Sequence, residues 1–151
     1  MSGKKLFAVC IDGSKHSERA FEWYCKCAHR EGYTVGLVHI HQLPSSLGGL
    51  YEDGPGLQVL VDESVTESKR IIKKYQELCK AKGITALTLC QTNQGSIGQT
   101  ICNIAKANSA EAIIIGQRGL GIVRRTFLGS VSDYVLHHSH VPTIVIPTTK
   151  Q

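Results

Sequence analysis

The sequence predicts an α/β fold: a single doubly wound domain in which helices cover both faces of a five-stranded parallel sheet. Short, almost wholly apolar runs alternate along the chain with segments whose apolar residues recur at helical spacing. The crossovers of such alternating chains are right-handed, which places helices on both faces of the sheet. A chain of 151 residues suits one hydrophobic core, so we expect one domain over residues 1–151.

The first elements follow from two apolar runs. Leu6–Ile11 is continuous and apolar, as in a strand that is buried on both faces. Helical spacing begins after Ser14, so Ser14 or Asp12 is expected to cap the first helix, and Gly32 is expected to end it. Tyr33–His41 is dense in β-branched and apolar residues, which predicts the second strand.

The remaining elements continue the alternation after Leu43–Gly56, whose prolines, glycines and serines predict a long surface loop. The expected elements are a helix over Leu57–Lys82, a strand over Ile84–Leu89, a helix over Ser96–Asn108, a strand over Ala112–Ile115, a helix over Ser130–His140 and a strand over Val141–Pro147. Because proline donates no amide hydrogen, Pro142 and Pro147 favour an edge position for the last strand.

Charge and composition narrow the class of partner. The net charge of +5 and the pI of about 8.9 favour an anionic partner. The compact basic group of Arg118, Arg124 and Arg125 lacks interleaved aromatic residues, so we expect a small phosphate-bearing ligand and no nucleic acid. No apolar stretch is long enough to cross a bilayer, and Met1–Lys5 does not resemble the start of a signal peptide. We therefore expect a cytoplasmic protein with no membrane partner.

Cysteine and histidine spacing indicates neither disulfides nor a zinc site. The six cysteines lie within apolar periodic segments, which favours reduced thiols. Cys25 and Cys27 form one close pair, and His39 and His41 form another. Neither pair has the spaced companion pair of a structural zinc site, so we predict no metal bound directly by the protein.

The segment GQRGLGIVRRTFLGSVSDYV, which begins at Gly116, follows an apolar strand and leads into a helix. Gly116 and Gly119 carry no side chain, so backbone amides can approach a ligand closely. Gly129 and Ser130 lie where the helix begins, and the unpaired amides there attract anions. The Ser130 hydroxyl and the Val131 amide add donors. The segment contains no GKS or GKT, and no GxGxxG follows the first strand, so it is neither a Walker loop nor a dinucleotide fingerprint.

The order of strand, GxxG, nine residues, GS and helix resembles the nucleotide-binding pattern of the universal stress protein family. The resemblance extends along nearly the whole chain. It implies that the chain binds ATP or AMP, with Mg²⁺ held through the nucleotide phosphates. It also implies a homodimer joined through the strand Val141–Pro147, an edge that would otherwise be open to pairing.

The same resemblance implies a role for individual residues. Asp12 would face the ribose hydroxyls or a phosphate-bound metal, and Ile40 would bind adenine through its backbone. Cys10 and Ile115 would line the base, and Arg118 would neutralise phosphate charge. Plain core positions for Cys10, Ile40 and Ile115, and helix capping for Asp12, remain open as alternatives.

The predicted function is that of an ATP-binding, nucleotide-dependent regulatory protein of the stress response. We expect at most slow hydrolysis and no enzymatic role, because no residue pair offers an obvious arrangement for activating water. Two alternatives remain. One is an adenylating or phosphotransfer enzyme on the same scaffold, and the other is a nucleotide-free interaction module that uses Leu43–Gly56 for recognition.

Overall fold

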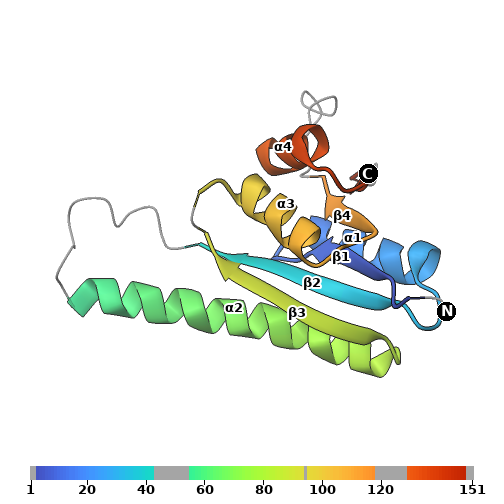
Figure 1. Cartoon of the computed structure of the whole chain (residues 1–151). Coiled ribbons are helices and arrows are strands. Elements are labelled where there is room, and N and C mark those ends of the chain that lie inside the picture. Colours follow the sequence, from blue (N-terminus) through green and yellow to red (C-terminus); the bar gives the residue numbers. More distant parts are fainter. Residues whose placement is uncertain (1–2, 43–54, 94, 118–128, 149–151) are drawn as a thin grey trace.

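The computed structural model describes residues 3–42, 55–93, 95–117 and 129–148. Its strands form one parallel sheet of five strands in the order β3-β2-β1-β4-β5 (Figure 1). The elements are β1 (Leu6–Cys10), α1 (Lys15–Trp23), the π-helical turn η1 (Tyr24–Ala28), β2 (Thr34–His41), α2 (Pro55–Ala81), β3 (Thr85–Thr92), α3 (Ile97–Ala107), β4 (Ala112–Gly116), α4 (Ser130–His138) and β5 (Thr143–Ile146). The predicted α/β fold class is confirmed.

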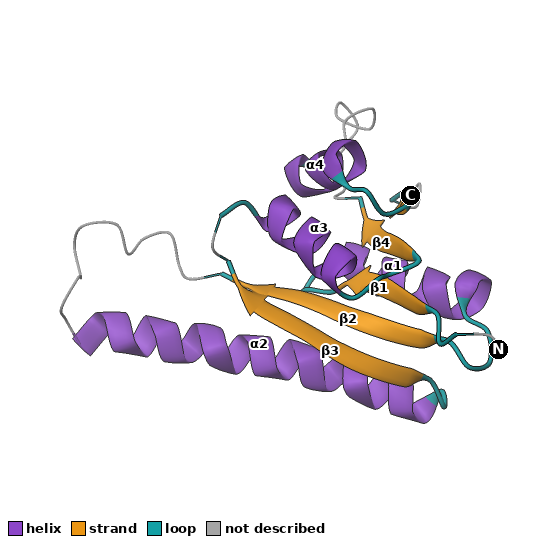
Figure 2. Cartoon of the chain, viewed as in Figure 1, coloured by secondary structure: helices purple, strands orange, loops and turns teal. Residues whose placement is uncertain are grey.

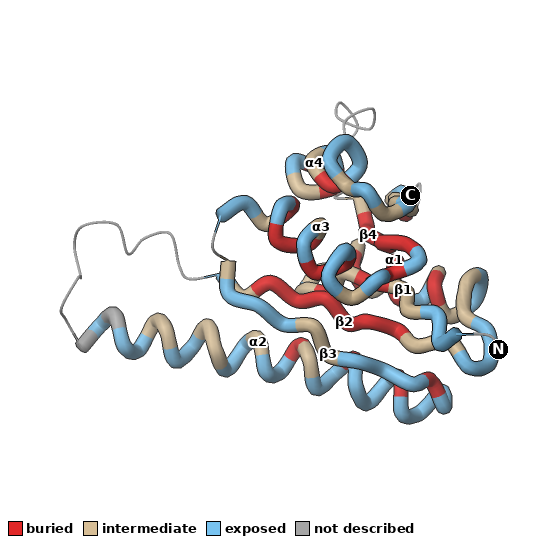
Figure 3. The backbone as a smooth tube through the Cα atoms, in the orientation of Figure 1, coloured by how far each residue is buried: buried red, intermediate tan, exposed pale blue. Residues whose placement is uncertain are grey.

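Helices cover both faces of the sheet, as predicted (Figure 2). Phe21 of α1 and Tyr75 of α2 belong to one core cluster, whereas Ile104 of α3 and Val135 of α4 belong to the other. The most deeply buried stretches lie in β1, β2 and β4, between these two helical layers (Figure 3). In the described part of the chain, no helix has both the length and the apolar character needed to cross a membrane.

Local chemistry sets the ends of the first two helices. Ser14 caps α1, because its Oγ accepts a hydrogen bond from the Ser17 amide at 3.3 Å. The prediction that the first helix ends at Gly32 is wrong: helical structure ends at Ala28, and Gly32 has φ +83° in the turn before β2. Gly83, with φ +67°, ends α2 as expected from the tolerance of glycine for this conformation.

The two edge strands differ from each other in length and burial. β3 runs to Thr92 instead of the predicted Leu89, because its last three residues, although exposed, still pair with β2. β5 forms the other edge, as Pro142 and Pro147 predicted. α2 begins at Pro55 instead of Leu57, since proline is well suited to the first helical position.

Gly98 allows α3 and α4 to pack closely. A Cβ atom at position 98 would lie 2.6 Å from Cδ1 and 2.9 Å from Cβ of Tyr134. The Tyr134 Cβ cannot move without the α4 backbone, so a larger residue would push the two helices apart.

We expect Gly98→Ala to lower the free energy of unfolding, measured by urea denaturation. Overpacking costs about 1–3 kcal/mol, which outweighs the gain in helix propensity of up to about 1 kcal/mol. Gly95→Ala is the matched control, because its new Cβ would lie 3.6 Å from Gln99 Oε1, an ordinary contact. A Gly98→Ala protein as stable as the wild type would contradict this account of the α3–α4 contact.

Candidate functional site

A cavity of about 200 Å³ lies at the carboxyl end of the sheet. β1 and β4 are neighbours there, although the chain leaves β1 towards β2 on one side and leaves β4 towards β5 on the other. Such a reversal opens a crevice between the strands, and ligands of doubly wound folds bind in that crevice. The first turns of α1, α3 and α4 contribute to its wall.

The cavity gathers most of the residues singled out in the sequence. The site residues predicted from the sequence that line it are Cys10, Asp12, Ile40, Ile115, Gly116, Gly129, Ser130 and Val131. Arg118 and Gly119 lie outside the described residues. Residues more than a hundred positions apart in the chain therefore meet at one place, as the glycine loop and the strand ends predicted.

Gly116 ends β4 against the first turn of α1. A Cβ atom at this position would lie 2.2 Å from the carbonyl oxygen of His16 and 2.7 Å from its carbonyl carbon. The sequence explained Gly116 by the close approach of a ligand to the backbone. The structure adds a different reason: the α1 backbone already occupies the space that a side chain would need.

One part of the cavity wall is apolar. Ile40 and Ile115 line it and are 9% and 6% exposed. Both also pack in the core beneath α3 and α4, so the core interpretation and the cavity interpretation hold together. Cys10 lies beside them, and burial, with smaller contributions from Asp12 and Cys102, raises the pKa of its thiol to about 12. This thiol is therefore protonated at neutral pH.

The start of α4 forms a polar part of the wall. Gly129 is the N-cap in an extended conformation, with φ −62° and ψ 156°, and among the described residues no side chain caps the helix. The first amides of a helix have no partner within the helix, and the helix dipole favours an anion at this end. Ser130 is exposed at this end, and the Ser132 hydroxyl donates to the Gly129 carbonyl at 3.1 Å.

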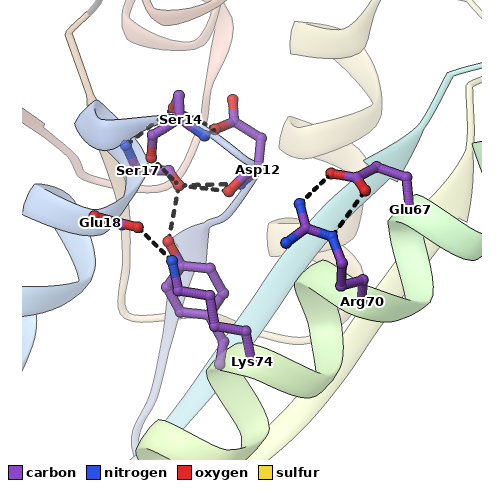
Figure 4. Close-up of polar contacts among 8 residues, drawn as sticks. Asp12, Ser14, Ser17, Glu18, Glu67, Arg70 and Lys74 are labelled. Atoms are coloured by element: carbon purple, nitrogen blue, oxygen red, sulfur yellow. Dashed lines mark hydrogen bonds and ion pairs between the residues drawn. The ribbon is translucent and has the colours of Figure 1, made fainter.

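Asp12 occupies the tight turn between β1 and α1 (Figure 4). Its Oδ1 accepts hydrogen bonds from the Ser14 amide at 2.8 Å and from the Ser14 hydroxyl. Its Oδ2 lies 3.7 Å from His16 Nε2. Asp12 therefore supports the residue that caps α1 but does not cap the helix itself.

These contacts determine the charge on Asp12. Burial raises the pKa of the carboxyl, but the hydrogen bonds from Ser14, with His16 and Ser17, outweigh burial and hold the pKa below its ordinary value. The carboxylate is therefore ionised at neutral pH. Its contribution to folding stability is present above the unfolded-state pKa and is lost as the pH falls through the lower, folded-state pKa.

Sequence reasoning missed the contribution of α1 to the cavity. His16 and Ser17 line it from the first helical turn. The sequence did contain a signal for His16 and Ser17, because a helix that starts directly after Asp12 must bring its first turn to the same sheet edge. Among the described residues, no group of three or more histidine, cysteine or acidic residues could hold a metal ion.

Comparison with known proteins identifies relatives of the chain. The model of the Universal stress protein family matches residues 5–147. Universal stress protein YxiE of Bacillus subtilis is 27% identical over 91% of this chain and 95% of its own length. Universal stress protein Slr1101 of Synechocystis is 43% identical over 39% of this chain. The chain covers 56% of Slr1101 and 46% of a Mycolicibacterium smegmatis universal stress protein, so it spans about half the length of these two relatives.

Solved structures share the fold. Protein MJ0577 superposes with a TM-score of 0.78 at 20% identity, covering 97% of this chain and 98% of that one. A universal stress protein family protein from Arabidopsis thaliana with AMP bound has a TM-score of 0.70 at 19% identity, covering 94% and 90%. A universal stress protein in complex with cAMP has a TM-score of 0.70 at 22% identity, covering 98% and 100%. The family model matches residues 5–147, which is nearly the whole of this chain. The chain therefore belongs to the universal stress protein family.

Proposed function

We propose that this protein binds ATP, with Mg²⁺ held through the nucleotide phosphates, in the cavity at the carboxyl end of the sheet. The observation that carries the proposal is the composition of the cavity wall, which combines apolar side chains, an ionised carboxylate and the amino end of a helix. A flat apolar base, a ribose and an anionic phosphate chain match these three features. The AMP and cAMP held by two proteins of the same fold support an adenine nucleotide.

In this proposal each part of the wall contacts a different part of the nucleotide. Cys10, Ile40 and Ile115 surround the base, and Asp12 accepts hydrogen bonds from the ribose hydroxyls. The phosphates meet the amino end of α4, where Gly129, Ser130 and Val131 supply amides and a hydroxyl. The resemblance to the family pattern implies that Arg118 and Gly119 also belong to the phosphate site. Bound Mg²⁺ would reduce the charge repulsion among the phosphates.

We propose a regulatory binding role in the cytoplasm as the principal function, with hydrolysis slow. Two of the histidines that sequence reasoning considered are engaged with α2 and do not line the cavity. His39 Nε2 lies 3.0 Å from the Ser68 hydroxyl, and His41 Nε2 lies 2.7 Å from the Ser64 hydroxyl.

The homodimer is proposed to form through β5. The Ile113 amide donates to the Pro142 carbonyl, and the Gln117 amide donates to the Ile146 carbonyl, each at 2.8 Å. Because backbone groups alternate sides along a strand, Val145 directs its amide and carbonyl away from β4, towards the open edge. Two copies related by a twofold axis could pair these edges and satisfy each other's backbone groups.

Ser130→Asp tests the phosphate site without weakening the helix. The helix dipole stabilises a carboxylate in the first turn of α4, but the same carboxylate repels a phosphate group. We expect the affinity for MgATP, measured by calorimetric titration, to fall at least about tenfold, equivalent to about 1.4 kcal/mol. The neutral Ser130→Asn variant controls for size and should lose much less affinity. Equal affinities of Ser130→Asp and the wild type would exclude the amino end of α4 as the phosphate site.

Asp12→Asn tests the ribose contact, because asparagine keeps an oxygen acceptor for Ser14 but carries no charge. Hydrogen bonds to charged groups contribute about 1.5–3 kcal/mol, so we expect the affinity for ATP to fall by about tenfold or more. The wild type should bind 2′,3′-dideoxy-ATP with a similar loss, and Asp12→Asn should bind ATP and the dideoxy analogue equally. Glu111→Gln, an exposed change just before the amino end of β4, is the control. A loss that disappears when EDTA removes Mg²⁺ would assign Asp12 to the metal instead.

Val145→Pro tests the β5 interface, because it removes the outward amide of an edge strand while retaining a similar side-chain volume. We expect it to convert a dimer to a monomer in sedimentation velocity at micromolar concentration. Val145→Thr keeps the amide and the shape of the side chain, so it should remain dimeric. A wild-type protein that sediments as a monomer at this concentration would rule out the interface.

A further inference from the structure

Two buried hydroxyl groups connect α2 to the turn that carries Asp12. Ser17 of α1 is 3% exposed and Tyr75 of α2 is fully buried. The Ser17 Oγ and the Tyr75 hydroxyl oxygen lie 3.0 Å apart. Ser17 also contacts the backbone of Asp12, next to the cavity (Figure 4). A side chain on α2 therefore reaches the candidate site through a single intermediate.

The hydrogen bonds of Ser17 determine which hydroxyl donates. The Asp12 amide donates to Ser17 Oγ at 3.1 Å, and the carbonyl oxygen of Asp12 lies 2.9 Å from the same Oγ and can only accept. A serine hydroxyl has one hydrogen and two acceptor positions. The Ser14 carbonyl oxygen also lies 3.2 Å from this Oγ and can only accept. Once the hydrogen is directed to either carbonyl, of which that of Asp12 is nearer, Tyr75 must donate to Ser17. Both backbone groups of Asp12 are thus held by a hydroxyl that Tyr75 orients.

α2 also holds Ile11, the residue before Asp12, through His39 of β2. His39 Nδ1 lies 3.0 Å from the carbonyl oxygen of Ile11, and its Nε2 lies 3.0 Å from the hydroxyl of Ser68 on α2. Because a carbonyl only accepts, Nδ1 carries the hydrogen of this bond. α2 therefore holds the backbone on both sides of the peptide bond between Ile11 and Asp12. Tyr75 does not line the cavity, so its hydroxyl reaches the site through Ser17.

We propose that Tyr75 is a positioning residue, whose hydroxyl holds Ser17 and thereby the Asp12 turn in the geometry that receives the ligand. The inference rests on the proposed nucleotide site, because the residue that Tyr75 positions is Asp12. It also makes α2 part of that site's regulation. Ligand binding that requires a fixed Asp12 stabilises the packing of α2, and a displacement of α2 weakens binding by the same factor.

Tyr75→Phe tests the proposal, because it removes only the hydroxyl. The ring keeps its edge contact with Phe21, whose centroid lies 5.1 Å away. In the nucleotide-free protein, we expect hydrogen exchange of the Asp12 amide, measured by NMR, to be several times faster than in the wild type. Tyr33→Phe makes the same chemical change at the opposite end of β2 and should leave the exchange of Asp12 unchanged. Unchanged exchange in Tyr75→Phe would overturn the proposal whether or not the protein binds ATP.

A double-mutant cycle with Asp12→Asn separates positioning from a general structural effect. One hydrogen bond contributes about 1 kcal/mol, so Tyr75→Phe should weaken MgATP binding about fivefold in the wild-type background. It should have almost no effect in the Asp12→Asn background, because the residue it positions is already impaired. Equal losses in both backgrounds would refute a role through Asp12. If the wild type does not bind MgATP, the proposed nucleotide function fails, and the exchange measurement alone decides whether Tyr75 fixes the turn.

Discussion

The contact between the backbone of α1 and the end of β4 is the constraint on which the site depends. Gly116 and the His16 carbonyl approach so closely that no side chain fits between them. β1 and β4 are hydrogen-bonded neighbours, so α1 can reach this position only by starting directly after β1. The short turn that results contains Asp12, and its tightness explains why Ser14 and Ser17 both bond to that residue. A wider separation of α1 and β4 would remove the turn and the cavity wall together.

Much of this arrangement could be predicted from the sequence, because it depends on local signals. Apolar runs, helical spacing and glycines predicted the sheet and its layers, and the glycine loop with Asp12 predicted which strand ends meet. The order of the strands could not be predicted, since it depends on pairings between distant segments. The same is true of the buried contact of Tyr75 with Ser17, because hydroxyl groups on two helices become partners only once both helices pack on one face.

The two faces of β2 pack against different kinds of side chains. Val38 and Ile40 face α3 in an apolar core, whereas His39 and His41, which alternate with them along the strand, face α2. Buried polar groups require partners, and Ser64 and Ser68 supply them at spacings that match the strand. α2 has 27 residues and packs mainly on β2 and β3. Paired polar groups of this kind allow only one alignment of such a long helix on the sheet, because a slip would leave buried donors and acceptors unpaired.

The high pKa of Cys10 affects how readily its thiol is oxidised or alkylated. Peroxides and alkylating agents attack the thiolate form of cysteine, and a thiol with a pKa of about 12 is almost never in that form at neutral pH. An oxygen atom added to this sulfur would take up space in the cavity that Cys10 lines. The raised pKa of the Cys10 thiol keeps the fraction of the reactive thiolate small. The cavity can therefore keep its shape under oxidising conditions in which a more exposed thiol would be modified.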